Sequence, residues 1–236
     1  MTETSSLVVE KVSFCARGWL LDGNLSYPEE GTVRGTLVIA GPHPHLGGDM
    51  ENNVVKTLAE VAACHGMATL RFDYRGVGKS EGPPMDVGGR FAEFLATSHV
   101  SDEDDLWHDL HAGSMFLERE FPSRLRAIAG YSFGCSLLPA ALGYARGDRL
   151  RGVPLVLVAP TVSRHNFDAF CRVAEPLAVL ASEDDFATSV QDLDMWFSRL
   201  KMPREMHRRP CDNHFFRGHE EWVARTAVSF IQRHWD

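Results

Sequence analysis

Ser132 is the residue whose neighbours are best arranged for nucleophilic chemistry. It lies in the sequence Gly-Tyr-Ser-Phe-Gly, between an apolar stretch over 125–129 that predicts a buried strand and a stretch over 136–144 that predicts a helix. A serine on such a strand-to-helix turn projects its hydroxyl, and the flanking glycines let neighbouring backbone approach closely. An ordinary glycine-rich turn can carry the same short pattern, so its meaning depends on which other groups the chain brings to Ser132.

Two further groups that this chemistry requires follow later in the chain. A serine hydroxyl is a weak nucleophile at neutral pH, so it needs a base within hydrogen-bond reach and a third group that orients the base. Asp184 and Asp185 follow a predicted strand over 176–180, and His214 follows a predicted strand over 206–209. Because functional residues gather at the carboxyl ends of the strands in an open α/β sheet, these segments can meet near the serine.

Three histidines are candidates for the base. His207 belongs to the last predicted strand, His219 precedes the closing helix over 220–235, and His214 lies in the loop between strand and helix. The loop position favours His214. Both aspartates follow the same strand, so placement after a strand leaves the choice between them open.

The elements that would position these groups alternate between strands and helices. The segments 8–16 and 19–26 predict an antiparallel opening pair, and the apolar run 36–40 predicts a central strand that is buried on both faces. Asp49 can cap a following helix, and 67–74 predicts the next strand. This order of elements predicts βαβ units and a parallel sheet.

The segment 75–80 ends in Gly-Lys-Ser after a strand, which is how a phosphate-binding loop ends. The leading glycine of that pattern would have to stand at position 73, where the chain has Asp73, and prolines follow where a helix should begin. We therefore interpret this segment as a structural turn.

The segment 83–100 is less regular, and Met85, Phe91, Phe94 and Leu95 could line one side of a short helix. It is either a small lid or a surface insertion whose phenylalanines pack on the domain. Ser101 can then cap a helix with an acidic first turn, 102–105, which the helix dipole explains without a function. The apolar positions expected to face the core from this helix are Leu106, Leu110, Met115 and Phe116.

Composition bounds the protein class. A chain of 236 residues with 44% hydrophobic and 24% charged residues suits one sizeable α/β domain, taken here as 1–236. A net charge of −8, without runs of Lys and Arg, argues against nucleic acid and anionic membranes as partners. The five cysteines are odd in number and form no C-x-x-C pair, so we expect free, mostly buried thiols and a cytoplasmic protein.

From Leu37 onward, the chain resembles the α/β-hydrolase superfamily, and most closely its small bacterial serine hydrolases without a large cap. The resemblance implies a mostly parallel, twisted sheet of about eight strands with helices on both faces and an antiparallel N-terminal strand. Two departures are Ser182, where the family usually has glycine, and the longer insertion at 83–100. The motifs that carry the resemblance are His43-Pro44-His45-Leu46-Gly47-Gly48 with Asn53, the segment from Arg71 to Gly82, Gly130-Tyr131-Ser132-Phe133-Gly134, the segment from Ser182 to Phe186, and Asp212-Asn213-His214-Phe215-Phe216.

The resemblance also implies roles. Ser132 corresponds to the nucleophile and His214 to the general base. Asp185 corresponds to the orienting acid, because it stands three residues past the position of the family's glycine, and Asp184 is the alternative.

An oxyanion requires two preorganised N–H donors. The backbone of Phe133, the residue after the nucleophile, is expected to supply one. The loop 41–48 is expected to supply the other, and because proline has no N–H, His43 is favoured over its alternatives His45 and Leu46. His43 and His45 form a His-x-His pair, but no third ligand follows at a convincing spacing, so no metal is expected.

These features predict a serine hydrolase that cleaves a small-molecule carboxylic ester or thioester through an acyl-enzyme, without a cofactor. An acyltransferase or cyclase that uses the same triad is the alternative, and a non-catalytic binding module is a third option. The expected partner is a small-molecule acyl substrate, and both a monomer and a homodimer are compatible with the sequence. The residues expected to bind the substrate are His45, Leu46, Tyr131, Phe91 and Phe94.

Overall fold

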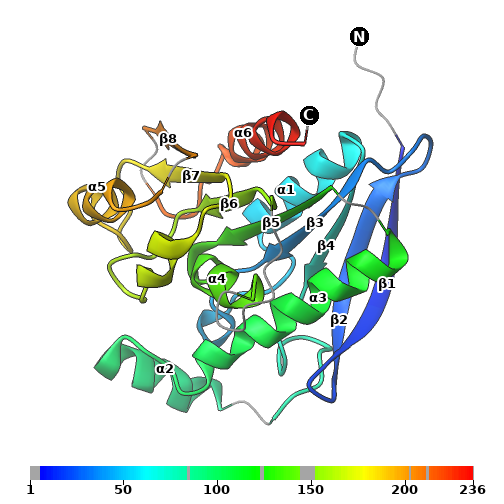
Figure 1. The fold of residues 1–236 in the computed structure, drawn as a ribbon. Coiled ribbons are helices and arrows are strands. Elements are labelled where there is room, and N and C mark those ends of the chain that lie inside the picture. The colour runs from blue at the N-terminus through cyan, green and yellow to red at the C-terminus, as the bar shows by residue number, and fades with distance from the viewer. Residues whose placement is uncertain are drawn as a thin grey trace.

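An eight-stranded sheet runs through the centre of the computed structural model, which describes residues 6–83, 86–122, 125–143, 152–201, 203–210 and 213–235. The strands lie side by side in the order β1-β2-β4-β3-β5-β6-β7-β8 (Figure 1). They are β1 (Leu7–Ala16), β2 (Trp19–Pro28), β3 (Gly35–Ala40), β4 (Met67–Phe72), β5 (Arg126–Tyr131), β6 (Leu155–Val158), β7 (Leu177–Ser182) and β8 (Arg204–Arg209).

Most of the sheet is parallel. β1 pairs with β2, and β2 with β4, in antiparallel fashion. Every other neighbouring pair, from β4–β3 to β7–β8, is parallel. The predicted mostly parallel sheet with an antiparallel opening pair is therefore confirmed, and the carboxyl ends of β3, β5, β6, β7 and β8 share one edge.

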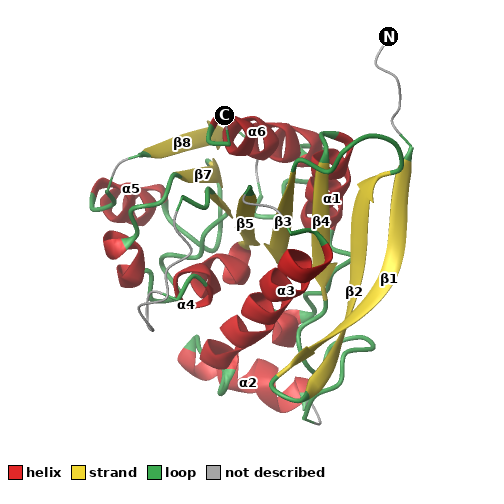
Figure 2. Ribbon diagram, turned by 45° about the vertical axis from the view of Figure 1, so that its right-hand side comes forward, coloured by secondary structure: helices red, strands yellow, loops and turns green. Residues whose placement is uncertain are grey.

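Helices cover both faces of the sheet (Figure 2). One core packs α1 and α6 against one face, and the other packs α3, α4 and α5 against the opposite face. The α-helices are α1 (Asn53–Cys64), α2 (Val87–Thr97), α3 (Trp107–Glu120), α4 (Leu138–Ala141), α5 (Val190–Ser198) and α6 (Glu220–Arg233), and the 3₁₀ helices are η1 (Pro44–Leu46), η2 (Glu103–Leu106), η3 (Ser132–Leu137) and η4 (Asp168–Arg172).

The central strands are mostly apolar because both of their faces meet helices. Every residue of β3, β4, β6 and β7 is buried. The outer strand β1 instead mixes exposed and buried positions. This difference is why continuous apolar runs identified the central strands in the sequence.

Four local expectations are wrong. The cap of α1 is Asn52, whose side-chain oxygen accepts from Val54 N and Val55 N, because Asp49 lies too early and instead accepts from Glu51 N. Ser101 caps no helix: its hydroxyl donates to Glu93, and η2 intervenes before α3.

The helix predicted over 136–144 is also shorter than expected. The chain after Ser132 forms η3 and then α4, with Pro139 at the first positions of α4, where its missing N–H costs no helical bond; Tyr144 lies outside the described residues. Met115, expected to face the core from α3, is 47% exposed, whereas Leu110 on the same helix is fully buried.

The segment 75–80 is a turn bound to β2. The Ser80 hydroxyl donates to the Asp73 carbonyl and accepts from Asp22 N, and a Cβ on Gly78 would lie 2.3 Å from the Asp73 carboxylate. These contacts give its serine and glycine a structural role.

Four cysteines lie in the described part of the chain, and all four are free thiols. Cys135 is buried and Cys171 partly buried, but Cys15 and Cys64 are exposed, so the expectation of mostly buried thiols is wrong. Cys211 falls outside the described residues. Among the helices described, none has both the length and the apolar character required to cross a bilayer.

Candidate active site

Ser132, His214 and Asp185 form a continuous hydrogen-bonded chain at the carboxyl edge of the sheet. His214 Nε2 lies 2.7 Å from Ser132 Oγ, and His214 Nδ1 lies 2.9 Å from both carboxylate oxygens of Asp185. Their side chains are largely shielded from solvent. Because Asp185 accepts the proton on Nδ1, Nε2 is free to accept the serine proton.

Backbone geometry explains why Ser132 stands where it does. It has a φ of 55°, in the left-handed region that non-glycine residues rarely occupy, at the junction of β5 and η3. A Cβ on Gly130 would lie 2.6 Å from Cys135 N, and one on Gly134 would lie 2.3 Å from the Ala40 carbonyl oxygen. Both glycines are therefore needed for the sharp turn and for its close approach to the end of β3.

The structure distinguishes the two candidate acids. The side chain of Asp185 is 6% exposed, and in addition to His214 it accepts from Ala187 N at 2.7 Å. Asp184 is exposed and has its backbone N–H bonded to Ser182 Oγ. A shift of one residue in the loop after β7 would bring Asp184 instead of Asp185 to His214. The order of residues in the sequence therefore left this choice open.

The other two candidate bases lie elsewhere. His207 Nε2 contacts Glu205, and His219 Nδ1 accepts from Arg209 Nε. His214 is further held by Tyr131, whose hydroxyl donates to the His214 carbonyl and whose ring stacks on the imidazole at 5.8 Å between centroids. Burial raises the pKa of Tyr131, so the phenol stays neutral.

A cavity of about 480 Å³ opens above the Ser132 hydroxyl. Its walls are mostly apolar, as in pockets that bind small molecules. Leu46, Tyr131 and Phe94, expected to bind substrate, are among its lining residues. The other lining residues are Pro42, His43, Gly47, Gly48, Asn52, Leu95, Ser132, Phe133, Thr161, Arg164, His165, Phe186, Ala187, His214 and Phe215.

Two residues expected to bind substrate do not line this cavity. His45 is buried and faces a smaller neighbouring hollow with Trp19 and Arg75, because η1 turns its side chain away from Ser132. Phe91 is 49% exposed on α2, and its helical neighbour Phe94 points inward instead. Met85 lies outside the described residues. Helix α2 thus contributes Phe94 and Leu95 to the cavity wall.

The two loops expected to supply oxyanion donors are in contact. The ring of His43 lies 4.5 Å from the ring of Phe133, measured between centroids. The missing side chain of Gly134 allows the turn after Ser132 to approach the Ala40 and Gly41 carbonyls at the end of β3. The backbone of the residue after the nucleophile and that of the β3 loop therefore border the same end of the cavity.

One residue of the site was missed in the sequence. Glu103, which appeared as part of an acidic helix start, is fully buried, and its Oε2 lies 2.9 Å from His43 Nε2. Its neighbours in sequence, Asp102, Asp104 and Asp105, are exposed. A helix dipole explains all four carboxylates equally well, so nothing in the sequence separated the buried one from the rest.

Glu103 belongs to both groups of described side chains that could hold a metal ion: His43–Glu103–His165 and His99–Glu103–Asp104, each with its candidate ligand atoms within 4.8 Å of one another. The first fits a metal poorly. His43 Nδ1 accepts the His45 N–H, so Nε2 carries the proton and offers no lone pair. In the second group only Glu103 is buried.

Comparisons with known proteins concern the family and the fold of this chain. A model of the Alpha/beta hydrolase family matches residues 45–234. The fold is similar to an α/β serine hydrolase without lid from Xanthomonas campestris (TM-score 0.77, 23% identity, 95% of this chain and 94% of that chain). It is also similar to an α/β serine hydrolase homologue from Coxiella burnetii (0.74, 24%, 93% and 96%) and an esterase from Pyrococcus furiosus (0.71, 17%, 97% and 92%). No curated protein matches the sequence.

Proposed function

Because the chain belongs to the alpha/beta hydrolase family, we propose that it is a serine hydrolase that cleaves a small-molecule carboxylic ester or thioester through an acyl-enzyme. The observation that carries the proposal is the hydrogen-bonded chain Ser132–His214–Asp185 at the base of an apolar cavity. A serine with a base and an oriented acid is what acyl transfer requires.

The chemistry follows from these contacts. Ser132 Oγ attacks the carbonyl carbon while His214 Nε2 takes the hydroxyl proton, and Asp185 stabilises the resulting imidazolium. The tetrahedral intermediate collapses, the C–O or C–S bond breaks, and His214 returns the proton to the leaving group. A water molecule then attacks the acyl-enzyme with the same proton transfers, which releases a carboxylic acid and restores the Ser132 hydroxyl.

The developing negative charge needs donors that are already in place. We assign this role to the backbone N–H groups of Phe133 and His43, which border the same end of the cavity. Phe133 follows the nucleophile at the start of η3, where helical N–H groups have no partner within the helix. Support for His43 comes from the contact of its ring with Phe133.

The cavity favours a small acyl substrate. Its volume of about 480 Å³ lies within the range of small-molecule sites. Phe94, Leu95 and Leu46 form apolar walls that suit a hydrocarbon acyl group. We therefore propose a small-molecule acyl substrate as the partner.

We also propose a cytoplasmic location, because the cysteines are odd in number and form no C-x-x-C pair.

The same residues would serve an acyltransferase or cyclase, in which an alcohol, amine or internal nucleophile replaces water. The difference lies in how well the occupied site excludes water. Product analysis with and without an added alcohol or amine separates the two. Acyl transfer to the added nucleophile in preference to hydrolysis would replace the proposed function with this alternative.

The proposal is tested by labelling with a fluorophosphonate, which reacts with activated serines. The wild type should be labelled, while Ser132→Ala and His214→Ala should not. Ser163→Ala removes an exposed hydroxyl on the loop after β6 and should be labelled like the wild type. Labelling that survives in Ser132→Ala would refute the nucleophile, and an unlabelled wild type that turns over no ester would favour a binding module.

A further inference from the structure

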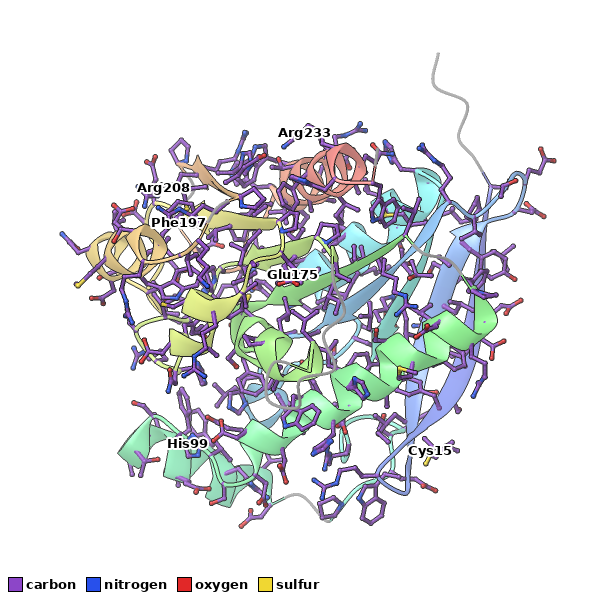
Figure 3. All side chains as sticks on the ribbon, in the orientation of Figure 1. Cys15, His99, Glu175, Phe197, Arg208 and Arg233 are labelled. Carbon is purple, nitrogen blue, oxygen red and sulfur yellow. The ribbon has the colours of Figure 1, made fainter. Side chains whose placement is uncertain are left out.

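Glu103 stands between two segments that are far apart in sequence. One is the loop after β3, which carries His43. The other is the chain that leaves α2, which carries His99 and Val100. Figure 3 labels His99 beside α2 at the lower edge of the molecule. The side chain of Glu103 is 1% exposed.

On one side, Glu103 holds the His43 ring. His43 Nδ1 accepts the His45 N–H at 3.2 Å, so the proton is on Nε2 and is donated to Glu103 Oε2 at 2.9 Å. Both ring nitrogens are therefore fixed. The fixed ring packs against Phe133 at 4.5 Å and Phe94 at 5.7 Å, measured between ring centroids.

On the other side, Glu103 fixes the exit of α2. The same Oε2 accepts Val100 N at 2.9 Å, and Glu103 N donates to the Val100 carbonyl at 3.2 Å. Val100 is fully buried, and α2 ends just before it at Thr97, where the C-cap residue Ser98 has a left-handed φ of 57°. These bonds close the turn that aims α2, and with it Phe94, toward the cavity.

The second oxygen of Glu103 lacks a formed bond. Oε1 lies 2.6 Å from His99 Nδ1 and 3.6 Å from His165 Nε2, but neither contact has the geometry of a hydrogen bond. His165 is held through Nδ1 by Thr161 Oγ1 at 2.8 Å, and its buried Nε2 has no partner among the described residues. Such unmade bonds are costly in an interior.

A buried carboxylate of this kind is a poor way to gain stability. Burial alone would raise the pKa of Glu103, but the hydrogen bond from His43 and the surrounding histidines hold it below its ordinary value, so the group is ionised. Apolar side chains often stabilise an interior as well as or better than buried charges do. The arrangement is better explained by what Glu103 holds in place.

We propose that Glu103 is a positioning residue of the active site, which acts through His43 on the oxyanion end of the cavity and through Val100 on helix α2. It touches no reacting atom. Its carboxylate sets the His43 ring against Phe133, and this contact sets the distance between the two loops that carry the oxyanion donors. The inference rests on the proposed function, because its effect is measured on acyl transfer.

The test compares three variants: Glu103→Ala, Glu103→Gln and His43→Ala. The substitution His43→Ala removes the imidazole ring but keeps the backbone N–H at position 43. We expect Glu103→Ala and His43→Ala each to lower kcat by about 10²-fold, since a small displacement of a preorganised group costs that much. KM should change less. Glu103→Gln retains an oxygen that can accept from His43 and Val100, and it should recover most of kcat.

A double-mutant cycle separates positioning from general support of the fold. If Glu103 acts through His43, the double variant Glu103→Ala/His43→Ala should be no slower than Glu103→Ala alone. A merely structural role would lower the melting temperature and the fraction of titratable active sites but leave kcat per site unchanged. Unchanged kcat per site in Glu103→Ala, or multiplied losses in the double variant, would overturn the proposal.

Controls keep the outcome unambiguous. Asp105→Asn, an exposed carboxylate two residues away, should behave like the wild type. If Glu103→Ala fails to fold, an unchanged kcat in His43→Ala overturns the proposal by itself. One zinc ion bound per wild-type chain and lost in Glu103→Gln would overturn it in favour of a metal site. A wild type that fluorophosphonate does not label refutes the proposed function instead.

Discussion

Gly134 and Ala40 approach so closely that a Cβ on Gly134 would lie 2.3 Å from the Ala40 carbonyl oxygen. They belong to the turn after the candidate nucleophile and to the last position of β3. This approach brings Phe133 and the loop after β3 together. The glycine therefore serves the geometry of the site as well as the turn itself.

Gly134→Ala should damage both stability and activity. The added methyl group meets backbone that cannot rotate away, so we expect about 1–3 kcal/mol loss in the free energy of unfolding and at least about 10²-fold loss in kcat. Urea unfolding and ester hydrolysis measure the two effects. Gly88→Ala on α2 is the control, because its nearest contact would be an ordinary 3.6 Å to Asp86; comparable damage there would discredit the steric explanation.

Asp185→Asn and Asp184→Asn should differ sharply. Asparagine at 185 cannot stabilise the imidazolium form of His214, so we expect kcat to fall by about 10²- to 10⁴-fold. Asp184 is exposed, and its substitution should leave kcat unchanged. Steady-state kinetics on one ester measure both variants, and equal activities would remove Asp185 from the proposed triad.

Phe94→Ala should change the preference among acyl chain lengths, since its ring forms part of the cavity wall. We expect kcat/KM for longer acyl chains to rise by about tenfold relative to acetyl esters. Phe91→Ala, on the exposed face of the same helix, should keep the wild-type profile. A series of p-nitrophenyl esters provides the measurement, and matching profiles for the two variants would deny α2 a part in selectivity.

Arg164 is the one Lys, Arg, Asp or Glu among the described residues that line the cavity. It is exposed, and a guanidinium at a cavity rim favours a substrate that carries an anionic group. Arg164→Gln should raise KM by about fivefold for esters whose acyl chain ends in a carboxylate, in line with a solvent-exposed ion pair. KM for neutral esters serves as the reference, and a parallel rise in both would contradict an electrostatic role.

His45 should make the protein less stable in mild acid. Burial, together with the neighbouring His43, lowers the pKa of His45 to about 4 from 6.5. Between these two pKa values, His45 is protonated in the unfolded chain but neutral in the folded chain. The free energy of unfolding therefore falls as the pH drops from 6.5 to 4, by at most about 1.4 kcal/mol per pH unit. Urea unfolding at pH 7 and 5 should show a smaller loss in His45→Gln, and an identical loss would assign the effect to other groups.

Much of the fold could be predicted from local patterns. The runs that became β3, β6 and β7 are mostly apolar because both faces of these strands are covered. Helix boundaries were less accurate. Asn52 and Asp49 are both of residue types that cap helices well. Which of them caps α1 depended on the residue at which the loop after β3 ends and the helix begins.

Some residues of the candidate site could likewise be predicted from local patterns, and others could not. Ser132 was visible because the turn demands glycines at fixed spacing around it, and His214 because it follows the last strand. His45 and Phe91, expected to bind substrate, do not line the cavity above Ser132, whereas their neighbours Leu46 and Phe94 do. The 3₁₀ turn η1 and the helix α2 set which of these side chains face the cavity.

The sequence by itself determined the order of elements, the strand-to-helix turn at Ser132 and the set of groups that could activate it, because steric limits and hydrophobic periodicity act over short distances. Only the tertiary structure decided which aspartate meets His214 and that Glu103 is buried beneath His43. The physical reason is that both outcomes depend on how loops from separate strands pack at one edge of the sheet. A shift of one residue there exchanges a buried carboxylate for an exposed one.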